Sequence, residues 1–316
     1  MRTLLPLLLV TSCTTDAAEP SGKSQAPAGF WDAWGDGRAE LDGYRVVQPR
    51  YGEERRGEAV LVFVTEDFTA KTRVKSDGGH GDEFPVLKLN VALDFQTGIY
   101  DYNAMTSAFV ALDGRDALGV PTKVAFGAQE WCGHVYDHLL TFGDRYERTS
   151  HSYFDGEADR SGSREIPRGA VFLDAMPIYA RALAGALVKE GASVDVKVHP
   201  RLMDLRFQHR EASWLDGTLS REAVPEPVSV PAGTFEVQRT TVKAGSSVWT
   251  WETEKAAPHR LIRWTGPDGE VGELTGSIRE PYWSQHDEGQ EVLRAKLGLA
   301  DPSWLRPEPA APASGG

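Results

Sequence analysis

The sequence predicts a mainly β protein, in which a large curved antiparallel sheet or half-barrel carries one helix packed across its concave face. Three observations favour this fold class. Alternating or continuous apolar runs, separated by turn residues, recur from about residue 40 to residue 285. The 316 residues include 32 Gly and 19 Pro, which indicates many turns rather than long helices. A strong helical stripe occurs in one segment, residues 174–190, so we expect the sheet to dominate the fold.

The first thirteen residues have the layout of a bacterial export signal. A basic start at Arg2 precedes an apolar run over residues 4–10, which is shorter than the roughly 20 residues that a membrane-spanning helix needs. Val10-Thr11-Ser12-Cys13 is similar to the lipobox of bacterial lipoproteins, whose cysteine is acylated and becomes the first residue of the mature chain. We therefore expect residues 1–12 to be a signal peptide and Cys13 to carry diacylglycerol and a fatty acid.

The segment behind Cys13 is predicted to be a flexible tether. Residues 14–29 are rich in Thr, Ala, Ser, Pro and Gly and offer little to pack. Two or more acyl chains suffice for stable anchoring, because each buried methylene contributes roughly 0.8 kcal/mol. The residue after Cys13 is Thr14 rather than Asp, which favours the outer membrane, with the protein facing the periplasm. We expect the lipid anchor to be the membrane contact of this protein.

Residues 30–170 form the predicted N-terminal β region. Residues 59–64 are continuously apolar between charged flanks, as in a strand that is covered on both faces. Residues 76–82 are polar and Gly-rich, which predicts a loop that does not divide the region into domains. Further strands are predicted at residues 86–89 and 97–109, and residues 121–140 form one long strand or two.

The predicted helix covers residues 174–190. Asp174 is suited to the N-cap, Pro177 is tolerated in the first turn, and Gly191 follows the expected end. Its apolar stripe consists of Met176, Tyr179, Ala180, Leu183 and Leu187. This stripe predicts that the helix lies on the sheet.

Residues 171–285 are predicted to hold this helix and a C-terminal β region of the same or an adjoining sheet. Residues 225–227, Pro-Glu-Pro, read as a stiff connector, and Gly-Pro-Asp-Gly at residues 266–269 has the chemistry of a hairpin turn. The strands expected here are residues 194–198, 235–242, 248–252 and 260–264. Residues 286–316 are predicted to form a short helix over residues 287–299 and a Pro- and Ala-rich tail that buries nothing.

Several segments resemble uncharacterised bacterial proteins. Pro-Ala-Gly-Thr-Phe at residues 231–235 and Pro-His-Arg-Leu-Ile-Arg-Trp at residues 258–264 resemble a periplasmic domain of unknown function, built as a large curved antiparallel sheet. Residues 84–90, 105–107, 129–134 and 151–159 are similar to a family of uncharacterised bacterial lipoproteins. Some members are labelled septum formation inhibitor Maf, but this sequence lacks the Ser-Pro-Arg-Arg-type motif of true Maf pyrophosphatases. The resemblance covers about residues 30–285, and it implies a location and a fold but no catalytic residue.

The densest group of reactive side chains lies between residues 130 and 157. If residues 130–138 are one strand, alternation places five side chains on one face. These are Glu130, Cys132, His134, Tyr136 and His138, with His151 and Glu157 further along the chain. Thiolate and imidazole groups suit Zn²⁺ or Cu, and Cys132 with His134 would suit a nucleophile and its base. The alternative is a polar, aromatic-lined face of a sheet without a ligand, since neighbours on one strand rarely converge on one ion.

Cys132 is predicted to be a reduced, mostly buried thiol with a structural role. Acylation of Cys13 leaves it without an intrachain disulfide partner, and Trp131 and Val135 indicate a packed strand around it. The acidic alternation of Asp155, Glu157 and Asp159 suits weak Ca²⁺ binding or, as the simpler interpretation, a solvated loop.

The charge of the chain argues against a nucleic-acid partner. It has 34 Lys and Arg residues against 46 Asp and Glu residues, a net charge of −12. It also lacks the G-x-S-x-G, P-loop and G-x-G-x-x-G motifs of common enzyme families. We expect a non-catalytic binding or scaffolding protein, with an apolar ligand such as an acyl chain under the helix and no cofactor beyond the lipid on Cys13. The alternative is a metal-binding protein or a cysteine-dependent enzyme that uses Cys132, His134 and His138. The sequence names no protein partner.

Overall fold

The structure is a computed structural model and describes residues 26–299. The predicted signal peptide, Cys13, most of the tether and the Pro- and Ala-rich tail lie outside the described residues. In chain order the first eight strands are β1 (Ala39–Arg50), β2 (Glu53–Thr69), β3 (Glu83–Thr97), β4 (Tyr100–Ala111), β5 (Lys123–Glu130), β6 (Gly133–Phe142), β7 (Arg145–Ser152) and β8 (Arg160–Glu165). The other eight are β9 (Ala170–Phe172), β10 (Ser193–His199), β11 (Leu215–Arg221), β12 (Glu226–Val230), β13 (Gly233–Ala244), β14 (Ser247–Glu254), β15 (Leu261–Thr265) and β16 (Val271–Glu280).

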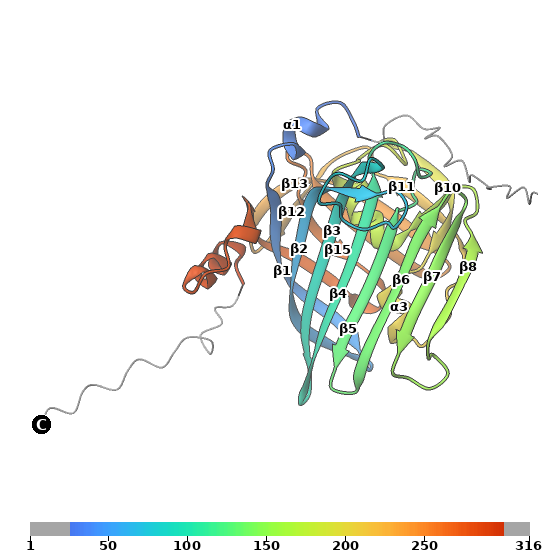
Figure 1. The fold of residues 1–316 in the computed structure, drawn as a ribbon. Helices are drawn as coiled ribbons and strands as arrows, with labels where there is room; N and C mark the ends of the chain where they lie inside the picture. Colours follow the sequence, from blue (N-terminus) through green and yellow to red (C-terminus); the bar gives the residue numbers. More distant parts are fainter. Residues whose placement is uncertain (1–25, 300–316) are drawn as a thin grey trace, which may run out of the picture.

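All sixteen strands belong to one sheet, which confirms the predicted mainly β fold (Figure 1). Strands β8 to β1 follow one another as antiparallel neighbours, β1 then pairs with β16, and the order continues through β15, β14, β13, β11 and β10 to β9. Strand β12 pairs with β13 beside this path, and β9 is parallel to β10. The two predicted β regions are therefore halves of the same sheet.

The connection between the two ends of the strand order makes the sheet curl. Strands β8 and β9 stand at opposite ends of the order, yet only residues 166–169 join them along the chain. Inside the curl, the ring of Tyr146 on β7 lies 5.5 Å from the ring of His199 on β10, and Phe172 on β9 stacks on His199 at 4.6 Å. An aromatic cluster thus bridges the two ends, and the sheet forms the predicted half-barrel.

Short helices cover the concave face. They are the 3₁₀ turn η1 (Leu173–Ala175), helix α2 (Met176–Arg181) and helix α3 (Leu202–Phe207). α2 contacts β3, β14 and β15, so it crosses from one half of the sheet to the other. The large buried core lies between these helices and the sheet, and its members include Leu61, Phe126 and Ile178.

The predicted helix over residues 174–190 is wrong in length, because α2 ends at Arg181. Beyond it the chain turns at Gly185, whose φ of +79° belongs to the left-handed region, and Gly191 also has positive φ. The apolar stripe is nevertheless buried at Tyr179 and Leu183, because a turn on a concave face can bury the same side chains as a helix. Asp174 does not cap this helix either: its carboxylate accepts a hydrogen bond from the backbone N–H of Leu202.

The remaining elements largely follow the local chemistry. Residues 267–269 form the 3₁₀ turn η2 (Pro267–Gly269), which closes the hairpin of β15 and β16 as predicted. Residues 121–140 are two strands joined at a turn, and the predicted connector at residues 225–227 is wrong because β12 begins at Glu226. The ends are α1 (Phe30–Trp34), η3 (Tyr282–Ser284) and η4 (Gln290–Leu297), the last of which is a 3₁₀ helix. No helix in the described part of the chain is long and apolar enough to cross a membrane.

Candidate functional site

A cavity lies between the concave face of the sheet and its helical cover. Its free volume is about 80 Å³. Inward-facing side chains of β1 to β4 form one wall, those of β14 and β15 form the other, and η1, α2 and α3 form the roof. Because side chains alternate along a strand, every second residue of these strands points into the cavity, as Ala59 and Leu61 do on β2.

Three tryptophans make one wall of the cavity apolar and aromatic. Trp249 and Trp251 on β14 and Trp264 on β15 line one side, facing aliphatic residues that include Leu61 and Leu93. Trp249 and Trp251 are buried, and both indole rings are too large to be repositioned without disturbing the core. The result is a rigid apolar wall with few polar atoms, which is the usual lining of a site for small ligands.

Asp174 places a carboxyl group in this apolar lining, and Glu270 places a second one there. Asp174 is buried on η1, and its Oδ2 accepts a hydrogen bond from the N–H of Leu202 at 3.2 Å. Burial raises the pKa of Asp174 to about 7, because the hydrogen bond and the charge of Arg201 only partly offset the loss of water. Near neutral pH this side chain can therefore either donate or accept a proton in a hydrogen bond.

The second polar group of interest is the indole N–H of Trp249. The side chain lines the cavity and is buried, and its Nε1 has no hydrogen-bond partner among the described residues. A buried donor without a partner costs about 1–3 kcal/mol. The indole N–H of Trp249 is therefore an unsatisfied donor enclosed within the packed tryptophan wall.

An ion-pair network closes the cavity beside α3. Arg201 donates from Nε to Asp204 at 2.8 Å and from Nη1 to Glu270 at 2.7 Å. Glu270 also accepts a hydrogen bond from Nε1 of Trp264 at 3.0 Å. Burial tends to raise the pKa of Glu270, but the Arg201 guanidinium outweighs it and holds the pKa below its usual value. The ion pair of Arg201 with Glu270 thus ties the start of α3 to the turn that precedes β16.

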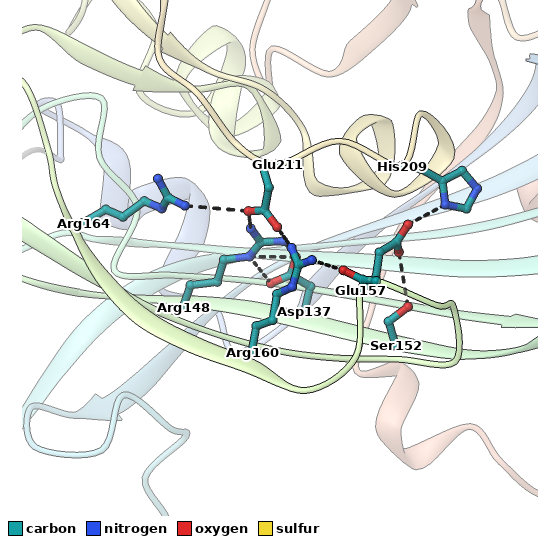
Figure 2. Close-up of polar contacts among 9 residues, drawn as sticks. Asp137, Arg148, Ser152, Glu157, Arg160, Arg164, His209 and Glu211 are labelled. Carbon is teal, nitrogen blue, oxygen red and sulfur yellow. Dashed lines mark hydrogen bonds and ion pairs between the residues drawn. The ribbon is translucent and has the colours of Figure 1, made fainter.

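A second hollow, the polar cleft, borders the C-terminal part of α3 and the residues that follow it. It has a volume of about 310 Å³ and is lined by β6, β7, the loop before β8, and α3 with the residues that follow it. Arg148 on β7 donates two hydrogen bonds to the carboxylate of Asp137 on β6, from Nε to Oδ1 at 3.0 Å and from Nη2 to Oδ2 at 2.6 Å. Figure 2 shows that Arg148, Arg160 and Arg164 all point at Glu211, which follows α3. The cleft is therefore a charged site with paired groups.

Glu157 joins two further groups in the polar cleft. Its Oε1 lies 2.5 Å from Nδ1 of His209, and its Oε2 accepts a hydrogen bond from Ser152 Oγ at 3.2 Å (Figure 2). A serine, a histidine and a carboxylate thus meet, but the carboxylate stands between the other two. The histidine does not contact the serine oxygen, so this order does not provide the general base of a hydrolytic triad.

The structure splits the predicted site group between two faces of the sheet. Glu130 points inward and is buried, with its Oε1 2.7 Å from Nη2 of Arg206 on α3. Glu157 lines the polar cleft. His134 and His138 lie on the opposite, outer face of β6, and His151 lies beside them on β7, paired with Asp159 at 2.9 Å. Residues 130–138 are thus two strands and a turn rather than one strand, so these side chains do not share one face.

The prediction of a buried Cys132 is wrong. The thiol is exposed, because Cys132 and Trp131 form the tip of the turn between β5 and β6. Trp131 is 69% exposed and donates its Nε1–H to Asp101 rather than packing over the cysteine. The pairing of Glu130 with Gly133 across the turn reverses the chain at this point, and the sequence pattern of a strand does not register such a reversal.

No group of three His, Cys, Asp or Glu side chains within residues 26–299 is arranged as metal ligands. The acidic alternation of Asp155, Glu157 and Asp159 does not converge, since Glu157 turns to His209 and Asp159 turns to His151. The expected acylation site, Cys13, lies outside the described residues. Comparison with known proteins found no matching family model, curated protein or solved structure.

The sequence did not indicate that residues 200–214 belong to the site. This segment contributes Arg201 and Met203 to the cavity, and Arg206, His209 and Glu211 to the polar cleft. A signal was present in the sequence: an apolar stretch with single charges, residues 202–207, runs directly into Gln-His-Arg-Glu at residues 208–211. Six residues are too few for a convincing helical period, so the pattern escapes detection.

Proposed function

We propose that this protein is a binding protein of the cell envelope, anchored through an acylated Cys13, and that it holds the apolar part of a small ligand in the cavity. The observation that carries the proposal is the cavity itself, walled by three tryptophans and aliphatic side chains beneath a cover of short helices. The lipobox-like start and the resemblance of residues 84–160 to envelope lipoproteins support the location.

The size of the cavity limits the ligand. Its free volume of about 80 Å³ is below the roughly 150 Å³ of an engineered cavity that binds benzene. A short alkyl end or one small ring is therefore the part that fits in place. A longer chain requires α3 to move and its ion pairs with Glu130 and Glu270 to break, so the closed cavity favours a short ligand.

The polar atoms of the cavity select the ligand further. Asp174 lines the cavity and offers a carboxyl group that can serve as donor or acceptor near neutral pH. A hydroxyl or carbonyl group on an otherwise apolar molecule matches this carboxyl group, because it can accept a hydrogen bond from the protonated form. The proposed ligand class is thus small alcohols, aldehydes or ketones with an alkyl or aryl body.

The wall tryptophans allow a direct test with the detergent-extracted full-length protein. A bromoalkanol such as bromohexanol carries a hydroxyl group and a heavy atom that quenches tryptophan on contact. We expect saturable quenching in the wild type. Ala104→Leu, which places bulk in the cavity, should weaken it at least several-fold, since a filled volume excludes the ligand.

The matched control is Ala92→Leu, since Ala92 is on the neighbouring strand β3 and its side chain points to the other face of the sheet from cavity-lining Leu93. The tryptophan fluorescence of this variant should be quenched by bromohexanol to the same extent as that of the wild type. Quenching that does not saturate, or that is the same in both variants when both melt cooperatively, would overturn the proposal. Native mass spectrometry of the extracted protein then identifies any co-purified ligand.

A further inference from the structure

We propose that Arg148, Arg160 and Arg164 form a binding site for a phosphate monoester, and that Glu211 of the same chain occupies this site in the structure. The site lies at the polar cleft and is separate from the apolar cavity, so it stands whether or not the cavity binds a ligand. Figure 2 shows the three guanidinium groups directed at the one carboxylate.

The register of two neighbouring strands builds the site. Arg148 on β7 pairs directly with Gly162 on β8. Arg160 and Arg164 stand two residues to either side of Gly162, so alternation places all three arginines on the same face of the sheet. Gly162 has no side chain, and an added Cβ there would meet nothing within 4 Å. The three arginines therefore surround an open position above Gly162.

The charges at the site are unbalanced without Glu211. Arg148 is already neutralised by Asp137, in a pair whose side chains are 16% and 9% exposed. Within residues 26–299, Arg160 and Arg164 each form an ion pair with a single carboxylate, and in both cases it is Glu211. Taking Glu211 away leaves two uncompensated guanidinium groups. Two positive charges and several N–H donors in fork geometry match a doubly charged phosphate group.

Glu211 is an occupant that an external anion can replace. It lies outside any helix or strand, in the loop after α3, and its side chain is 48% exposed. Its contact with Arg164 is long, 3.7 Å, because one carboxylate cannot satisfy three guanidinium groups at once. Asp137, Asp155 and Glu157 also line the polar cleft. Asp137 is paired with Arg148, and Glu157 is turned toward His209 and Ser152. The open volume of the polar cleft lies next to the arginines, which gives a ligand access.

The test compares phosphate binding by the full-length, detergent-extracted wild type and by Glu211→Gln, using calorimetry with inorganic phosphate in a phosphate-free buffer of low ionic strength. Glu211→Gln removes the competing carboxylate and keeps its shape. We expect it to bind phosphate at least about fivefold more tightly than the wild type, because the exposed carboxylate that competes for the three arginines is gone. Arg160→Gln with Arg164→Gln should abolish binding in either background.

The matched control is Glu165→Gln, which removes an 84% exposed glutamate from the same strand β8 and should leave phosphate affinity unchanged. Equal affinity of Glu211→Gln and Glu165→Gln would overturn the proposal, as would binding that survives loss of both arginines. Thermal melts establish that each variant is folded. Vesicles of phosphatidylcholine with and without phosphatidic acid then separate the sources: added binding to phosphatidic acid identifies a lipid headgroup, and phosphate binding without it identifies a soluble phosphate ester.

Discussion

At the scale of single residues, Asp174 combines burial with a role in holding the cover. Its carboxylate accepts the N–H of Leu202, the first residue of α3, and so links η1 to α3 across the roof of the cavity. An ionised carboxylate is the stronger acceptor for such a link, but burial raises the pKa of Asp174 to about 7 and so favours its protonated form below neutral pH. The same residue thus makes the roof sensitive to pH.

The first expected outcome concerns this pH dependence. An Asp whose pKa is 3.8 when unfolded and about 7 when folded binds more protons in the folded state between these values, so the free energy of unfolding falls as pH rises from about 4 to 7. The shift corresponds to about 4 kcal/mol. Asp174→Asn keeps a carbonyl acceptor for Leu202 but cannot ionise. Relative to the wild type, its stability should therefore rise by a few kcal/mol between pH 5 and pH 8.

Urea unfolding at the two pH values measures this difference, and Asp195→Asn is the control because Asp195 is exposed on β10. A gap between Asp174→Asn and the wild type that stays constant with pH would show that Asp174 is already ionised at pH 5.

The residue scale is also where the sequence misleads most. Glu130, Cys132 and His134 have the spacing of one strand face, yet the structure places a buried acid, an exposed thiol and an outward histidine there. Two strands and the tight turn between them have nearly the same alternation as one long strand. The tip of the turn consists of Trp131 and Cys132, which are not typical turn residues, so these two residues do not predict a turn at this position.

At the scale of elements, a buried arginine fixes α2 to the sheet. Arg181, the last residue of α2, is fully buried and pairs with Glu40 on β1. Its guanidinium lies 4.4 Å from the ring centre of Phe63 and 5.0 Å from that of Trp34, and it donates to the carbonyl of Pro258. A short helix has little packing area of its own, so this anchor decides its position.

Arg181→Ala is expected to lower the free energy of unfolding by about 3–5 kcal/mol, because it leaves the buried carboxylate of Glu40 without its close partner. Arg181→Met combined with Glu40→Gln should recover most of this loss, since neither replacement carries a charge. Chemical denaturation measures both. The control, Arg45→Ala, breaks an exposed pair with Glu273 and should cost no more than about 1 kcal/mol. Equal losses for Arg181→Ala and Arg45→Ala would contradict this account.

Elements were predictable where local chemistry determines them. The hairpin turn at residues 267–269 follows from Pro and Gly backbone preferences, and strands such as β2 and β13 follow from apolar runs. The length of α2 was not predictable, because its stripe continues past the turn at Gly185. α3 was missed for the opposite reason: it is short and mixed in polarity, and its position depends on partners such as Glu130 and Glu270 that are distant in sequence.

At the scale of the whole molecule, the sheet depends on pairings between the ends of the chain. Strand β1 pairs with β16, with Ala39 opposite Glu280, so the first strand sits in the middle of the order. Sequence patterns give the number and type of strands well, but they do not give this order, because pairing between distant segments leaves no local trace. The free strands β8 and β9 then meet through residues 166–169, which produces the curl that encloses the cavity.

The proposed lipid anchor on Cys13 determines how the whole molecule attaches to the membrane. The described body begins with α1 at Phe30, and between it and Cys13 the sequence offers only the proposed tether. Membrane association is then expected to depend on the acyl chains of Cys13. Cys13→Ser should move the protein from the membrane fraction to the soluble fraction, whereas Cys132→Ser, which changes the other cysteine, should leave it with the membranes.

Mass spectrometry of the membrane-extracted wild type should find Cys13 as the first residue, with the added mass of diacylglycerol and a fatty acid. Two acyl chains or more make release slow, because each buried methylene contributes roughly 0.8 kcal/mol. A chain that retains Met1, or a Cys13→Ser protein that still sediments with membranes, would be incompatible with a lipid anchor. The second result would direct attention to the folded body, where Ile99 and Trp131 at the turns of β3–β4 and β5–β6 are the exposed apolar side chains to replace next.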